Sequence, residues 1–217
     1  MARYHYREGV TLDKKKSRWF VIVIGIVVIA VAAYVAAVYL APQLVMVPFT
    51  GLTVDAINAK IQNSKAGQYG DRLFLPQINI DVAIHEGGGK SQLDAGAWQR
   101  DANLGNPEKG GNFVLSAHKF VLDTTPQLTR AKSPFYNLGK LKEGDELTLD
   151  YKGKRYVYKV DRTFDAALGN LEQKSDGYRL TLYPADAGGN AVSGVAVSAT
   201  RISPVTDQGG TVGFGGN

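Results

Sequence analysis

The chain has 217 residues, no cysteine, and 25 basic against 20 acidic residues. The absence of cysteine excludes disulfide bonds, thiolate metal ligands and a thiol nucleophile in this sequence. Much of the excess positive charge lies in residues 1–18, which hold six basic and two acidic residues. This charge therefore indicates a membrane flank, and a nucleic-acid partner is not expected.

Residues 19–41 form an uncharged stretch of 23 residues that is rich in Val, Ile and Ala. As a helix this stretch would be about 35 Å long, enough to cross a bilayer. The basic cluster at 14–18 precedes it, so the positive-inside rule places residues 1–18 in the cytoplasm and residues from 42 onward outside. The stretch is longer than the apolar region of a cleaved signal peptide. We therefore expect an uncleaved, single-pass anchor in the plasma membrane.

Residues 42–71 are predicted to be a juxtamembrane linker with one short helix. Thr53 is a suitable N-cap, because apolar residues follow it at intervals of three and four. Residues 72–203 are predicted to form the folded domain, and the glycine-rich residues 204–217 a flexible tail.

The pattern of the folded domain is mainly that of β-strands. Alternating apolar residues and turn signals predict strands, and residues 133–145 predict a helical turn packed through its apolar side chains. Residues 93–112 are predicted to be loop-rich. About seven or eight strands with short helices and no repeat indicate one mainly β domain, a closed barrel or a sandwich. The main predicted strands are 73–84 (interrupted near its start by Pro76), 112–118, 146–151, 155–164, 178–184 and 195–202.

Three positions at predicted strand ends bear on one another: His118, Ala185 and Gly194. A histidine beside a nucleophile, with a cationic group to hold the oxyanion, is the arrangement that acyl transfer requires. In this chain the residue at which the strand passes into the loop is Ala185, whose side chain is only a methyl group.

Four segments, in this order, resemble the sortase family. Residues 75–84 look like the first core strand of sortases, and residues 107–118 resemble the segment that leads to their catalytic histidine. Residues 133–145 are similar to their proline-phenylalanine-leucine turn. The run 181–185, Thr-Leu-Tyr-Pro-Ala, stands where sortases carry threonine, leucine, any residue, threonine and cysteine. The resemblance covers about residues 72–203 and implies a sortase-like closed β-barrel, of the class D or E housekeeping type.

Carried over by position, the resemblance implies the family histidine at His118, the nucleophilic cysteine at Ala185 and the arginine at Gly194. Two of these three positions are therefore substituted. Arg201 is a poor replacement, because seven residues of extended strand would place it roughly 20 Å away. Asp186 is a conceivable hydrogen-bond acceptor for His118, although a loop carboxylate is more often solvated.

Two explanations for Ala185 stay open: a naturally degenerate sortase, or a deliberate cysteine-to-alanine change in an active transpeptidase. Gly194 favours the first, because inactivating an enzyme does not require both changes. The expected function is then binding of a sorting-signal-like peptide or of an envelope or pilus protein, and a purely structural envelope scaffold is a further alternative. No cofactor and no metal are expected. The acidic residues available as calcium ligands have generic spacing: Asp81, Glu86, Asp94 and Asp101.

Overall fold

The computed structural model describes residues 14–41, 53–87, 90–167, 170–186 and 188–202. The predicted tail at 204–217 and most of the cytoplasmic segment lie outside these residues. Helix α1 runs from Lys14 to Leu40. Its part from Arg18 to Leu40 has 23 residues and a mean hydropathy of 3.0, so by length and composition it can cross a membrane.

Helix α2 (Val54–Asn63) begins at the predicted N-cap. The Thr53 side chain accepts a hydrogen bond from the backbone N–H of Ala56 at 3.1 Å, which satisfies one of the free donors at the helix start. Ile57 is buried. The predicted short helix and its cap are confirmed.

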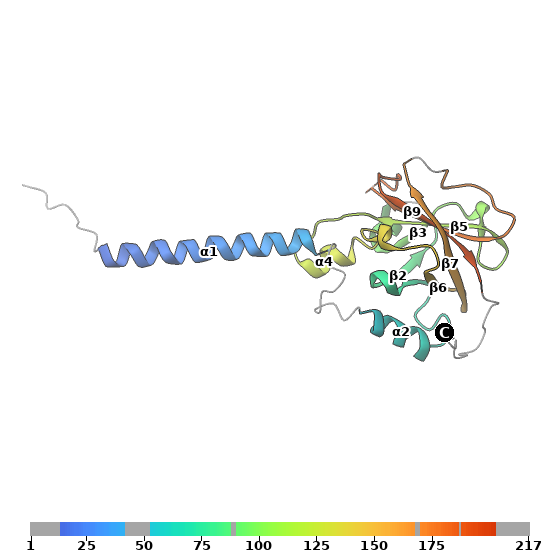
Figure 1. Cartoon of the computed structure of the whole chain (residues 1–217), viewed down its shortest axis with the longest axis horizontal. Helices are drawn as coiled ribbons and strands as arrows, with labels where there is room; N and C mark the ends of the chain where they lie inside the picture. The colour runs from blue at the N-terminus through green and yellow to red at the C-terminus, as the bar shows by residue number, and fades with distance from the viewer. Residues whose placement is uncertain (1–13, 42–52, 88–89, 168–169, 187, 203–217) are drawn as a thin grey trace, which may run out of the picture. The chain divides into compact units, whose positions relative to one another are not determined.

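Within the described residues the barrel domain has one sheet of nine strands, several of which are labelled in Figure 1. Their order in the sheet is β3-β2-β1-β6-β7-β9-β8-β5-β4, and β3 also pairs with β5. This last pairing closes eight strands into a ring and leaves the two-residue β4 paired only with β5. The predicted closed barrel is confirmed. The strands are β1 Arg72–Leu75, β2 Ile80–His85, β3 Ala97–Gln99, β4 Gly105–Asn106, β5 Gly110–His118, β6 Glu146–Tyr151, β7 Lys154–Asp165, β8 Tyr178–Ala185 and β9 Val195–Arg201.

The apolar side chains that alternate along these strands fill the interior of the barrel. In β2, for example, buried and half-buried residues alternate along all six positions, as expected for a strand with one face toward a core. The predicted helical turn closes part of this core through Phe135, Leu138 and Leu141, all of which are buried. The β6–β7 hairpin turns at Lys152 and Gly153, as predicted, and both have positive φ angles of 49° and 77°.

Two predictions for the first half of the domain are wrong in detail. Residues 73–84 form two antiparallel strands, because Pro76 starts a 3-10 turn and Asn79, with a φ of 55°, reverses the chain. Residues 93–112 hold more regular structure than expected, since short elements give too little periodicity to detect. The short helices of the domain are η2 Pro76–Ile78, α3 Lys90–Ala95, η3 Ala102–Leu104, α4 Pro126–Ala131 and η4 Leu138–Lys140.

Candidate functional site

The two strand ends that the sequence singled out lie side by side. Strands β5 and β8 are parallel neighbours, and the last pair in their register joins His118 to Ala185. The ladder continues for one more bond, in which the backbone N–H of Lys119 donates to the carbonyl of Ala185 at 3.2 Å. Tertiary structure therefore brings together a histidine and an alanine that are 67 positions apart in the chain.

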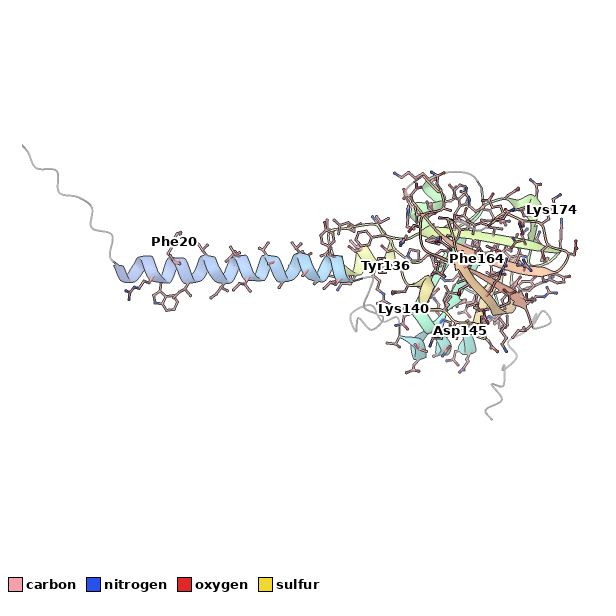
Figure 2. All side chains as sticks on the ribbon, turned by 45° about the horizontal axis from the view of Figure 1, so that its top comes forward. Phe20, Tyr136, Lys140, Asp145, Phe164 and Lys174 are labelled. Carbon is pink, nitrogen blue, oxygen red and sulfur yellow. The ribbon has the colours of Figure 1, made fainter. Side chains whose placement is uncertain are left out.

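His118 and Ala185 both lie on the outer face of the barrel. Side chains alternate along a strand, and Ala117 and Leu182 belong to the interior core, one position before His118 and three before Ala185. Ala185 belongs instead to a second apolar cluster, which packs against the outer face of β5, β8 and β9. Its members are Leu93, Val114, Ala166, Leu171, Tyr183, Ala185 and Ala196, with Trp98, Leu104 and Phe164 packed against them (Phe164 is labelled in Figure 2).

His118 is a buried, hydrogen-bonded residue. Its side chain is 4% exposed, and its Nε2 lies 2.9 Å from Oδ1 of Asp94 on α3. The expected candidate acceptor Asp186 is not its partner. The Asp186 carboxylate accepts the backbone N–H groups of Gly188 and Asn190, and these bonds lower the pKa of Asp186. Asp186 thus fixes the turn of the β8–β9 loop.

Gly194 lies beside a cation that the sequence interpretation missed. Lys119 Nζ donates to the carbonyl of Ser193 at 2.7 Å, and a Cβ atom built on Gly194 would be 3.5 Å from that nitrogen. Gly194 itself has a φ of 152°, a conformation that residues with a side chain rarely adopt. The signal for Lys119 was its place directly after His118 at the end of a strand.

Arg201 lies at the far end of β8 from Ala185. Arg201 donates to the carbonyl of Pro107 at 2.9 Å and lies over the ring of Tyr178. Tyr178 is the first residue of β8, whereas Ala185 is the last. The prediction that Arg201 is remote from the candidate site is confirmed.

The connection between β7 and β8 crosses the outer face and is fastened to it. The amide of Asn112 donates to the carbonyls of Leu171 and Gln173, at 3.4 and 2.9 Å. Glu172 bonds Arg100 at 3.2 Å and accepts from the Tyr183 hydroxyl at 3.2 Å. We call residues 171–173 the covering segment, because they lie over strands β5 and β8.

Tyr183 contributes a second hydrogen bond to this contact. Its side chain is on the outer face of β8, and burial raises its pKa to about 12. A neutral phenol can donate to Glu172, whereas a phenolate could not. The contact between the covering segment and β8 is therefore a hydrogen bond throughout the physiological pH range.

The β8–β9 loop closes the same face from another side. Gly189 has a φ of 85°, and a Cβ atom there would come within 2.6 Å of the Trp98 ring. The Arg100 guanidinium stacks on that ring at 4.1 Å. Ala185 is consequently only 2% exposed, and its methyl group faces other parts of this chain.

No metal centre is formed by the candidate carboxylates. Within the described ranges, no group of three or more metal-ligating His, Asp or Glu side chains comes together. The four acidic residues have separate partners: Asp81 pairs with Lys60 and Arg72, Glu86 with Tyr151, Asp94 with His118, and Asp101 with Asn103. A cavity of about 390 Å³ opens at another part of the barrel, beside Gln99, Lys109 and Tyr151.

The comparisons with known proteins agree with this geometry. The family model described as "Sortase domain" matches residues 73–186, more than half of the chain. The chain therefore belongs to the sortase family. A comparison with curated protein sequences gave no match.

Several solved sortases are similar to this chain. Sortase C1 of GBS Pilus Island 1 shares 23% identity at a TM-score of 0.50, over 70% of this chain and 80% of its own. Sortase C1 of Streptococcus agalactiae shares 24% identity at a TM-score of 0.50, over 63% of this chain and 68% of its own. Sortase E1 of Streptomyces coelicolor shares 20% identity at a TM-score of 0.46, over 64% of this chain and 92% of its own. The two matches at a TM-score of 0.50 show the fold alone, and membership of class D or E stays a prediction.

Placing an arginine at residue 194 is expected to destabilise the domain by about 1–3 kcal/mol, because the side chain must adopt a strained backbone conformation. Its Cβ would also lie 3.2 Å from the Pro184 ring. The measurement is urea unfolding of Gly194→Arg in detergent. Gly177→Arg is the matched control, since a Cβ there meets no atom within 4 Å. Equal stability of the two variants would contradict this account of Gly194.

Proposed function

We propose that this protein is a membrane-anchored, extracytoplasmic sortase homologue that does not catalyse transpeptidation and acts by binding a peptide or a protein of the cell envelope. The observation that carries the proposal is the register pair His118–Ala185. A thioacyl intermediate requires a sulfur at that strand end, and a methyl group cannot attack a carbonyl. His118 is then an inherited residue whose contact with Asp94 stabilises the fold.

The second substituted position supports the same conclusion. Gly194 supplies no cation, and its φ of 152° suits glycine. Two independent changes at one site are more consistent with natural loss of activity than with one deliberate substitution. Lys119 is the cation beside this position, but its ammonium group already donates to the carbonyl of Ser193.

The membrane location is supported by the apolar part of α1 and by the basic residues before it. The positive-inside rule favours a cytoplasmic N-terminus, which leaves the barrel domain on the outer side. Binding is proposed because peptide recognition does not require the nucleophile. A fold can keep its peptide-binding surface after it has lost its nucleophile.

Binding of sorting-signal peptides to the full chain in detergent tests the proposal, with fluorescence anisotropy for binding and mass spectrometry for cleavage. We expect binding without cleavage. If the peptide uses the outer face of β5 and β8, Glu172→Gln should tighten binding, because it removes the ion pair to Arg100 that holds the covering segment. Glu143→Gln, an exposed change elsewhere, is the control.

The outcomes separate the alternatives. Cleavage by the protein as it stands would contradict the loss of catalysis. Failure to bind any sorting peptide or envelope protein would contradict the binding role and leave the scaffold alternative, in which the barrel holds other envelope components without a peptide ligand.

A further inference from the structure

The segment that follows His118 has an inverted distribution of polarity. Between Phe120 and Ser133 three large apolar side chains are exposed: Phe120 by 38%, Leu122 by 47% and Leu128 by 44%. The buried side chains of the same segment are polar, namely Thr129, Arg130 and Ser133. A surface in contact with water normally has the opposite arrangement.

The exposed apolar residues are held outward by a fixed backbone. Thr129 Oγ1 accepts from the N–H of Asp123 at 2.9 Å and donates to its carbonyl at 3.2 Å. Ser133 Oγ accepts from the N–H of Val121 at 2.9 Å. Because α4 (Pro126–Ala131) carries Thr129, its bonds fasten Asp123 to the helix, and Ser133 holds Val121 just after the helix end. Leu122 and Leu128 are therefore presented on a rigid support.

The surroundings of this surface are aromatic and basic. The Phe120 ring lies 6.0 Å from the ring of Tyr136 (labelled in Figure 2), and tyrosine is enriched where proteins meet the lipid headgroups. Between residues 119 and 140 the chain has four basic residues and one acidic residue. The acid, Asp123, is paired with Lys132 at 2.5 Å.

We propose that Phe120, Leu122 and Leu128 insert shallowly into the outer leaflet of the membrane. We call these three residues the apolar tip. The inference rests on the proposed membrane anchor, but it does not depend on the loss of catalysis.

The length of the linker makes the bilayer the favoured occupant. Twelve residues separate Leu40 from Thr53, and they span at most about 43 Å when fully extended. An anchored domain is therefore always close to the membrane, so a weak surface contact is sufficient. Three side chains are too few for a stable protein–protein interface, which usually buries about 1,200–2,000 Å².

Such a contact would fix the direction in which the candidate site faces. The apolar tip begins two residues after His118, so its insertion would hold the end of β5 near the lipid surface. Partners of this site would then be proteins or peptides that are themselves attached to the membrane.

Spin labels on single cysteines test the proposal, because this chain has no other cysteine that could react. The full chain is placed in nanodiscs of phosphatidylcholine and phosphatidylglycerol, with the label at Leu122→Cys, Val27→Cys or Lys174→Cys. Collisions with oxygen report lipid, and collisions with a water-soluble nickel complex report solvent. Lys174 is exposed and lies on the far side of the domain from Tyr136 in Figure 2.

We expect the labels at 27 and 122 to be accessible to oxygen and protected from nickel, and the label at 174 to be accessible to nickel. In the Leu122→Cys protein, Phe120→Ser with Leu128→Ser should restore access of nickel, whereas the exposed control Ile202→Ser should not. That comparison separates insertion of the tip from the apolarity of the label itself.

Three results would overturn the proposal in different ways. Access of nickel to residue 122 with residue 27 still in lipid refutes the insertion and leaves the anchor intact. Access of nickel to residue 27 refutes the anchor, and with it the proposed membrane location. Protection of residue 122 from both reagents means that protein covers the tip.

Discussion

Ala185→Cys is expected to fold normally and to remain unable to cleave a sorting peptide. The new thiol would stand beside His118, its partner in the strand register, yet it would lie in the apolar cluster formed with Leu93 and Tyr183. Apolar surroundings disfavour the thiolate, which is the reactive form. The covering segment and the β8–β9 loop also lie between this position and solvent.

The reactivity of the thiol gives a direct measurement. We expect alkylation of Ala185→Cys by iodoacetamide to be slow in the folded protein and fast after unfolding. Ala191→Cys is the matched control, because Ala191 is the cross-bridge partner of Ala185 and its side chain is exposed. It undergoes the same substitution and should be alkylated readily.

A peptide-cleavage assay of the two variants then decides between the explanations for Ala185. If Ala185→Cys cleaves a sorting peptide and Ala191→Cys does not, the native site is that of an active transpeptidase, and the proposed loss of function is wrong. A variant that folds, is alkylated slowly and is inert agrees with natural degeneration.

Asp150→Asn is expected to destabilise the barrel domain by about 3–5 kcal/mol, because it leaves a buried guanidinium without its counter-charge. The Asp150 carboxylate is 0% exposed and accepts from Arg155 Nε and Nη2 at 2.6 and 2.8 Å. It also accepts the backbone N–H of Gly67 at 3.0 Å.

The same pair ties α2 to the barrel. Arg155 donates to the carbonyls of Ile61 and Ser64, at the end of the helix. Loss of Asp150 should therefore loosen α2 before the barrel unfolds, which hydrogen exchange of residues 54–63 would detect. If α2 and the barrel strands of the Asp150→Asn variant exchanged at the same rate, this order of unfolding would be contradicted.

An exposed ion pair supplies the control for the size of the loss in the free energy of unfolding. Lys154 and Glu108 are 3.2 Å apart, with side chains 41% and 32% exposed. Because solvent screens such a pair, Glu108→Gln should change the free energy of unfolding by less than about 1 kcal/mol. Both variants are compared by urea unfolding of the full chain in detergent. A loss for Asp150→Asn no larger than for Glu108→Gln would show that the buried pair is not a major contributor.

The amino-acid sequence by itself determined most of the strands and the absence of a thiol. Strand periodicity, the Thr53 cap and the Lys152–Gly153 turn are local features, and each can be recognised within a few residues. The order of the segments indicated the sortase barrel, which the family match to residues 73–186 confirms. The prediction that Ala185 occupies the cysteine position of the family rests on the order of these segments.

Only the tertiary structure decided what surrounds Ala185. The pairing of His118 with Asp94 joins β5 to α3, and α3 was too short to predict from periodicity. The covering segment reaches β5 through Asn112, 59 and 61 residues away in the chain. Contacts over such distances leave no local pattern in the sequence. The same holds for Gly194, whose φ belongs to a loop that lies against Pro184 and Lys119.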